Sequence, residues 1–167
     1  MLQSGKWLFW LLAVALVGTL LATFERLPPV VASHFDGAGV PTGWSSRPGY
    51  ALLLFTLGIL LPLGIIVLVH AVTRSGPGQL NIPARAYWTR PDHSAEAVRR
   101  VRAYMWWLGS VLAGTALLMH ALVLAAHRSE PPHLHTDLVV MVIGAVLLGV
   151  GAWAAGWYRL LRAPEAH

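Results

Sequence analysis

The sequence predicts an all-α integral membrane protein with four transmembrane helices and both termini in the cytoplasm. Charged residues make up only 11% of the chain and apolar residues reach 56%, whereas soluble domains carry about 25% charged residues. The charged residues also cluster, and long stretches between the clusters contain none of them. Water is therefore not the main solvent for this chain.

Four stretches of 18 to 26 residues contain no Asp, Glu, Lys or Arg. A helix of roughly 20 residues crosses the hydrocarbon core of a bilayer, so each stretch can form a span. The first stretch is long for the apolar core of a signal peptide and carries Trp7 and Trp10, so we expect it to be retained as a helix. We predict a single membrane domain over 1–167, with spans at about 7–25, 50–73, 103–127 and 138–159.

The distribution of basic residues predicts the orientation. Nine of the twelve lysines and arginines lie before the first span, in the loop 74–102 or after the last span, and three lie in the loops 26–49 and 128–137. Cytoplasmic loops of membrane proteins carry the excess of Lys and Arg, which places both termini inside and the loops 26–49 and 128–137 outside. The net charge of +5 then reflects topology, and we expect no nucleic-acid partner.

The outer loop 26–49 carries the first candidate site. Pro28 and Pro29 end the first helix, because proline lacks the amide proton that a helix needs. The loop is rich in Gly, Pro and Ser, so we expect an irregular segment that caps the outer ends of the helices, with a short extended piece around 31–35. The side chains in it that could contact a ligand or partner are His34, Phe35, Asp36 and Trp44.

Two further features concern the second and third spans. Pro62 lies in the middle of the second span and predicts a kink, because the Gly58 carbonyl loses its helical donor. In the inner loop 74–102, Tyr87 and Trp88 are expected at the level of the lipid headgroups. Asp92 is expected to be the N-cap of a helix that continues into the third span.

Small residues indicate where helices pack closely. In a bilayer no hydrophobic force drives helices together, and small side chains allow their backbones to approach. The fourth span carries such residues at i, i+4, i+7 and i+11, which forms one smooth stripe. We expect seams between the third and fourth spans, or between subunits, at Gly109, Gly114, Ala145, Gly149, Ala152 and Gly156.

The residues that could carry chemistry are mostly histidines. The chain has no cysteine, and no Asp, Glu, Lys or Arg lies in the interior of a predicted span, which argues against an ion-coupled transporter. His70 and His120 lie about 20 Å apart along the membrane normal by helical rise, too far to ligate one haem iron, so we expect no cofactor. His120 could hydrogen-bond a neighbouring helix or belong to a site. Candidate zinc or copper ligands on the outer side are His127, His133 and His135.

No catalytic residue is expected. Ser33, His34 and Asp36 bring together the residue types of a hydrolase triad, but no nucleophile elbow accompanies them. Proximity in the sequence does not make a triad.

The outer loop reads L-P-x-x-V-A-x-H-F-x-x-x-G-x-P-x-G-W-x-S-R from Leu27 to Arg47. This pattern resembles the signature of the bacterial membrane domain of unknown function found at the N-terminus of SdpI-type immunity proteins, where lysine is common at the position of Arg47. The inner segment 80–83, followed by Tyr87, Trp88 and Pro91, also resembles stand-alone members of that family. SdpI-type proteins carry a further multi-span domain, whereas two spans follow here.

The resemblance implies a bacterial inner-membrane protein that protects against a secreted peptide toxin or signals through a sequestered repressor. We therefore expect a non-enzymatic protein with an extracytoplasmic loop that binds a ligand or partner. One alternative is an accessory subunit of a larger membrane complex, docked through the small-residue stripes. Another is an envelope protein that binds copper or zinc through the outer histidines. The expected partners are the lipid bilayer, other membrane subunits or a secreted peptide.

Overall fold

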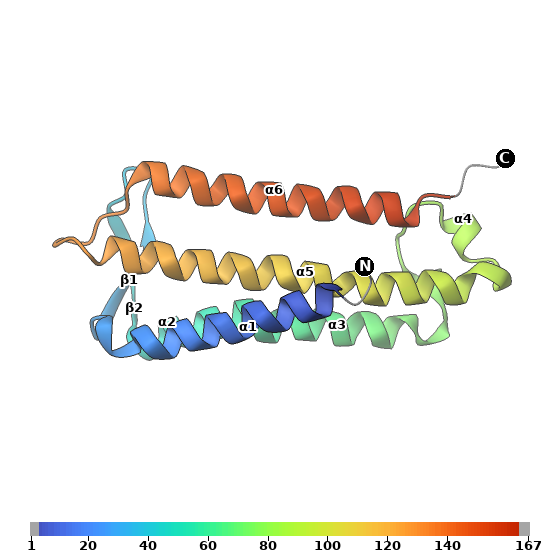
Figure 1. The fold of residues 1–167 in the computed structure, drawn as a ribbon, viewed down its shortest axis with the longest axis horizontal. Coiled ribbons are helices and arrows are strands. Elements are labelled where there is room, and N and C mark those ends of the chain that lie inside the picture. The colour runs from blue at the N-terminus through green and yellow to red at the C-terminus, as the bar shows by residue number, and fades with distance from the viewer. Residues whose placement is uncertain (1–3, 164–167) are drawn as a thin grey trace.

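The computed structural model describes residues 4–163 and is mostly helical. In that part of the chain, four helical segments are long and apolar enough to cross a membrane: Ser4–Arg26, Arg47–Ser75, Pro91–Ala126 and Thr136–Leu161. The chain is thus a multi-pass membrane protein, and each segment lies within a few residues of a predicted span apart from the longer third helix. Figure 1 shows the four helices side by side along one axis.

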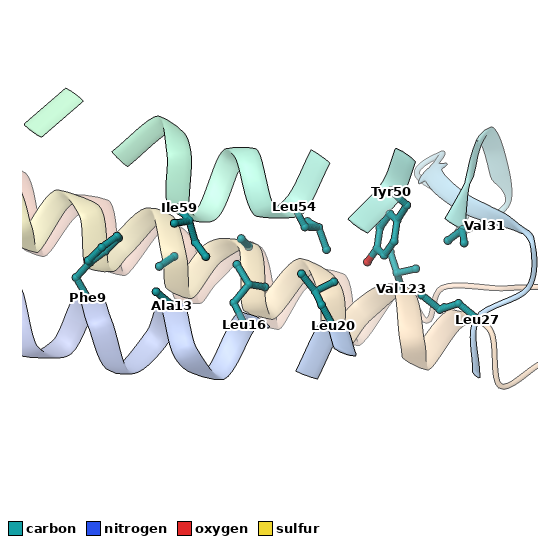
Figure 2. Packing of buried hydrophobic residues seen from close by; sticks show 12 residues of the cluster. Phe9, Ala13, Leu16, Leu20, Leu27, Val31, Tyr50, Leu54, Ile59 and Val123 are labelled. Atoms are coloured by element: carbon teal, nitrogen blue, oxygen red, sulfur yellow. The ribbon is translucent and has the colours of Figure 1, made fainter. Parts of the chain in front are cut away.

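Helix α5 (Pro91–Ala126) is the longest element and runs through the middle of the bundle (Figure 1). On one side of it lie α1 (Ser4–Thr23) and the second span. Figure 2 shows Phe9, Ala13, Leu16 and Leu20 of α1 pointing into the layer that α1, α5 and the second span share. These side chains recur every three or four residues, as one face of a helix requires. This apolar layer is the core of the protein.

Two of the predicted packing glycines lie at a different seam from the one expected. A side chain added at Gly109 would lie 3.1 Å from Phe9, and one added at Gly114 would lie 3.8 Å from Leu12. Both glycines of α5 therefore face α1, not the fourth span. The reason is that α5 packs on two sides, and its smallest residues admit the large side chains of α1.

The second span is not a continuous α-helix. It consists of α2 (Arg47–Phe55), a wide π-helical turn η2 (Thr56–Leu60) and α3 (Leu61–Val72). The wide turn directly precedes Pro62, so the irregularity predicted from that proline is present. Gly58 lies in the turn, where an added Cβ would come within 2.5 Å of Leu16 and 2.8 Å of Ala116. The distorted turn thus brings the second span close to both α1 and α5.

The loop after α1 is not irregular, as the sequence predicted, but forms a β-hairpin. After the short helix η1 (Phe24–Arg26), strands β1 (Val30–Phe35) and β2 (Pro41–Ser46) pair antiparallel. The register shifts on both sides of His34, and Ser46 caps α2 by accepting a hydrogen bond from the Gly49 amide. Such a short, bulged pair lacks a clean alternation of apolar residues, which is why its pattern is weak. We call this end of the bundle, with the α5–α6 connection beside it, the hairpin end.

The opposite end, called the α4 end, contains short helices η3 (Thr73–Ser75), η4 (Pro77–Gln79) and α4 (Arg85–Trp88). Trp88, expected at the level of the lipid headgroups, is 2% exposed and packs with Ile82, Ala97, Val101 and Leu161. The buried indole is satisfied because its Nε1 donates to the Leu161 carbonyl at 2.5 Å. The loop between the second and third spans is therefore a packed cap.

The start of α5 also differs from the prediction. The N-cap is Arg90, with Pro91 at the first helical position and Asp92 in the first turn. Proline is favoured there because its missing amide proton would have no helical partner and its φ suits a helix. Asp92 still places a negative charge near the positive end of the helix dipole.

Helix α6 (Thr136–Leu161) runs beside α5 on the side away from α1 (Figure 1). At the hairpin end, its first turns pack against Leu122 and Leu134. At the α4 end, Tyr104 of α5 donates a hydrogen bond to the Trp153 carbonyl at 2.9 Å. Gly156 lies against the Tyr104 hydroxyl so closely that an added Cβ would overlap it. This part of the small-residue stripe faces α5, as predicted, whereas Ala145 is exposed.

Candidate ligand site at the hairpin end

A pocket of about 670 Å³ opens at the hairpin end. Three segments form it: the chain from η1 to the start of β1, the end of the hairpin, and the α5–α6 connection. Its walls combine apolar groups such as Trp44 with charged side chains of both signs. The charged residues are Glu25, Arg26, Arg47 and Glu130. Pockets of this size, with a few polar groups on apolar walls, are typical of small-ligand sites.

Trp44 is the most exposed aromatic side chain of this pocket, with 54% of its surface accessible. It lies on β2 opposite Ala32, so the hairpin backbone fixes its position while the ring remains free to contact a ligand. Indole rings provide a large apolar contact surface and one hydrogen-bond donor. Of the four side chains predicted to bind a ligand or partner, Trp44 is the one that lines this pocket.

The other three predicted residues have local roles in the hairpin. The Oδ1 atom of Asp36 accepts hydrogen bonds from the amides of Ala38 and Val40, both at 2.9 Å, and so shapes the turn. Phe35 is half-buried and packs against the core near α5 and α6. His34 is exposed, with its Nδ1 3.1 Å from the Ser33 hydroxyl.

Arg47 connects the two helices beside the pocket. Its Nη1 donates to the Phe24 carbonyl at 3.0 Å and to the Glu25 carboxylate at 2.7 Å. The guanidinium also lies over the Phe24 ring, 5.0 Å from its centroid. Arg47 therefore fastens the end of α1 to the start of α2. Nothing in the sequence around Arg47 indicates this role, although Arg47 is part of the pattern from Leu27 to Arg47.

His127 attaches β1 to α5. Its Nδ1 lies 2.9 Å from the Val123 carbonyl, which can only accept, so Nδ1 carries the proton. Its Nε2 then accepts the hydrogen bond from the Ala32 amide at 3.2 Å. Both ring nitrogens of His127 are thus used by the protein itself.

His120 lies seven residues earlier on α5 and is 1% exposed. The Thr23 hydroxyl donates to the Thr19 carbonyl at 2.7 Å, and it therefore accepts from Nε2 of His120 at 2.9 Å. Nδ1 is then the acceptor for the Tyr50 hydroxyl at 3.0 Å. This chain of hydrogen bonds joins α1, α2 and α5, and it realises the structural role that the sequence analysis considered for His120.

The hairpin turn contacts the α5–α6 connection through Gly39. The Leu134 amide donates to the Gly39 carbonyl at 3.0 Å, and Gly39 has a φ of 80°. A Cβ on Gly39 would overlap the Leu134 carbonyl oxygen, so the two backbones meet where only glycine fits. The hairpin is therefore held at both ends: by His127 at its base and by Leu134 at its turn.

The histidines of the predicted metal site do not gather around one point. The rings of His133 and His135 are 5.8 Å apart and perpendicular. Within residues 4–163, no group of three or more His, Cys, Asp or Glu side chains is placed to hold a metal ion. A three-histidine centre would require His127 to give up the hydrogen bond on whichever ring nitrogen bound the metal.

One family model matches part of this chain. Residues 10–68 match the family described as Domain of unknown function (DUF1648). The matched segment runs from α1 through the hairpin into α3, about a third of the chain, and includes Trp44, Arg47, Tyr50 and Asp36. No curated protein and no solved structure shows a significant match to this chain.

We expect Gly39→Ala to destabilise the hairpin end. The new Cβ would overlap the Leu134 carbonyl, and the positive φ is strained for alanine, so the loss should be about 1–3 kcal/mol. Thermal unfolding of the purified protein in mild detergent measures this loss. Gly37→Ala is the matched control, because Gly37 lies in the same turn with nothing within 4 Å of an added Cβ. Equal melting temperatures for the two variants would contradict the proposed close contact.

We also expect the His120 and Tyr50 side chains to be energetically coupled. Tyr50→Phe should lower the free energy of unfolding by about 0.5–1.5 kcal/mol, and His120→Leu by about 1–3 kcal/mol because it leaves the Tyr50 hydroxyl unpaired. The double variant should lose less than the sum. Unfolding by SDS in mixed micelles gives the four values. His70→Leu serves as control, since the side chain of the exposed His70 bonds only its own helix, at the Ile66 carbonyl, among the residues described. Strict additivity would mean that the hydrogen bond contributes nothing.

Proposed function

We propose that this protein is a non-enzymatic bacterial inner-membrane protein that binds a secreted peptide at its hairpin end. The observation that carries the proposal is the pocket of about 670 Å³ beside the exposed Trp44. By its resemblance to SdpI-type proteins, the role is protection against a peptide toxin or signalling in response to one.

The chemistry of the pocket favours a short peptide segment with apolar and charged side chains. Trp44 and the prolines around it provide apolar contacts. Arg26 and Glu130 add charges of opposite sign that can pair with a peptide's own ionised groups. The pocket is large enough to hold a few side chains of a ligand but too small to hold a folded protein.

The orientation rests on the basic residues. Nine of the twelve lie in the first turn of α1, at the α4 end or in and just after the last turn of α6, and three lie at the hairpin end. This asymmetry supports a hairpin end that faces outward and termini that face the cytoplasm. An outward pocket can meet a secreted peptide without transport across the membrane.

Cysteine labelling tests the orientation cleanly, because the chain has no cysteine of its own. Gly37→Cys and Gly78→Cys lie at opposite ends, and both positions are exposed with open space around an added side chain. A membrane-impermeant maleimide should label Gly37→Cys in intact cells and Gly78→Cys only after lysis. The reverse pattern would place the pocket inside the cell and exclude the proposed ligand.

Trp44→Ala tests the pocket. Loss of a central indole contact commonly costs 2 kcal/mol or more, so affinity for the peptide should fall at least tenfold while the protein level stays unchanged. A deletion strain is complemented with each variant, and growth is measured against a panel of secreted peptide toxins. Sensitivity should return with Trp44→Ala and stay suppressed with Val40→Ala, which alters an exposed apolar residue of the hairpin outside the pocket.

Two results would overturn the proposal. If deletion of the protein changes sensitivity to none of the peptides, the immunity role fails. If Trp44→Ala lowers the protein level as much as the activity, Trp44 stabilises the hairpin rather than binding a ligand.

A further inference from the structure

A second, larger cavity of about 730 Å³ lies between α5 and α6 near the α4 end. Small residues of α6, Gly149 and Ala152, form part of its wall and leave space where larger side chains would fill it. Val111 lies opposite them on α5. We call this cavity the α5–α6 groove.

The groups along the groove follow a fixed order of depth. Arg159 is in the last turn of α6. At 1.5 Å per residue, Trp153 lies about 9 Å deeper in the span than Arg159, and Gly149 lies about 15 Å deeper than Arg159. The order is therefore a cation, then an indole, then apolar small residues. A phospholipid presents the complementary order along the membrane normal: phosphate, ester carbonyls and acyl chain.

Trp153 contributes an unsatisfied donor. Its Nε1 is inaccessible to solvent and has no hydrogen-bond partner among residues 4–163. At membrane depth no bulk water can satisfy such a group, and leaving it unpaired costs free energy. A turn of the indole toward the groove would bring Nε1 to an acceptor there, such as a lipid ester carbonyl, and would remove that cost.

The charge at the mouth of the groove favours an anion. Arg100 and Arg159 lie on its walls with a single carboxylate, Glu96. Arg100 is held in place, because its Nε donates to Glu96 at 2.6 Å and its Nη1 to the Leu160 carbonyl at 3.0 Å. Arg99 also pairs with Glu96, so the acidic group is already neutralised by its own helix. Arg159 is exposed and can turn toward a phosphate.

We propose that the α5–α6 groove binds one anionic phospholipid from the leaflet at the α4 end. Arg159 contacts the headgroup phosphate, Trp153 turns to donate to an ester carbonyl, and an acyl chain lies along Ala152, beside the point where Gly149 approaches Val111. This site is separate from the hairpin-end pocket. It depends neither on the proposed peptide ligand nor on the orientation of the chain.

Native mass spectrometry of the purified full chain, titrated with phosphatidylglycerol or phosphatidylcholine, tests the proposal. Phosphatidylglycerol should bind more tightly than phosphatidylcholine. Arg159→Gln should weaken phosphatidylglycerol binding about fivefold, the effect of one basic residue near an anionic surface. Arg162→Gln is the matched control and should leave binding unchanged, because Arg162 is exposed just beyond α6 and does not line the groove.

A second pair of variants tests the acyl-chain position. Ala152→Leu places a larger side chain in the groove and should reduce binding of both lipids, whereas Ala154→Leu, on the opposite side of α6, should not. Trp153→Phe keeps an aromatic ring but removes the donor, and should weaken binding of both lipids.

The proposal is overturned if phosphatidylcholine binds as tightly as phosphatidylglycerol, or if Arg159→Gln and Arg162→Gln behave alike. It is also overturned if Ala152→Leu disrupts a dimer of this chain without changing lipid binding, since a second copy would then occupy the groove. Melting temperatures measured without added lipid show whether each variant is folded. The variants within α6 are Arg159→Gln, Ala152→Leu, Ala154→Leu and Trp153→Phe. A folded Ala152→Leu variant that retains full lipid binding contradicts the assigned position.

Discussion

The hairpin end depends on two histidines spaced seven residues apart on α5. Because seven residues are close to two helical turns, His120 and His127 lie on one face of the helix. One imidazole ties α1 and α2 to α5, and the other ties β1 to α5. Each ring donates once and accepts once, so no polar ring atom is left without a partner in a region with little water. The positions of the hairpin and of Trp44 follow from these bonds.

The membrane-spanning helices could be predicted because the requirement behind them is local. A bilayer demands about 20 consecutive uncharged residues, and that length can be counted in the sequence. The hairpin could not be predicted in the same way. Its strands have six residues each, the register shifts around His34, and it is held by contacts with His127 and Leu134, which lie about 95 residues away. The burial of Trp88 could not be predicted for the same reason, since its partner Leu161 lies 73 residues away in the sequence.

The candidate site likewise contains one residue whose role could be predicted from the sequence and others whose roles depend on distant contacts. Trp44 was predicted as a ligand contact from its place in the loop 26–49, and it does line the pocket. The ion pair between Arg47 and Glu25 was missed, because it joins residues 22 positions apart through a turn whose path the sequence does not reveal. His127 has both the residue type and the position of a metal ligand, yet its nitrogens are used for packing. Residue type indicates what a side chain can do, while its partners decide what it does.

The small residues of α6 show how one sequence feature can serve two structural purposes. Such stripes in membrane proteins usually bring two helix backbones together. Gly156 follows this rule, because it admits the Tyr104 hydroxyl and so sets the separation of α5 and α6. Tyr104 is large, however, and between its contact with Gly156 and the approach of Gly149 to Val111, Ala152 lines a cavity between the two helices. The same stripe therefore fixes the contact at one point and leaves the α5–α6 groove open beside it.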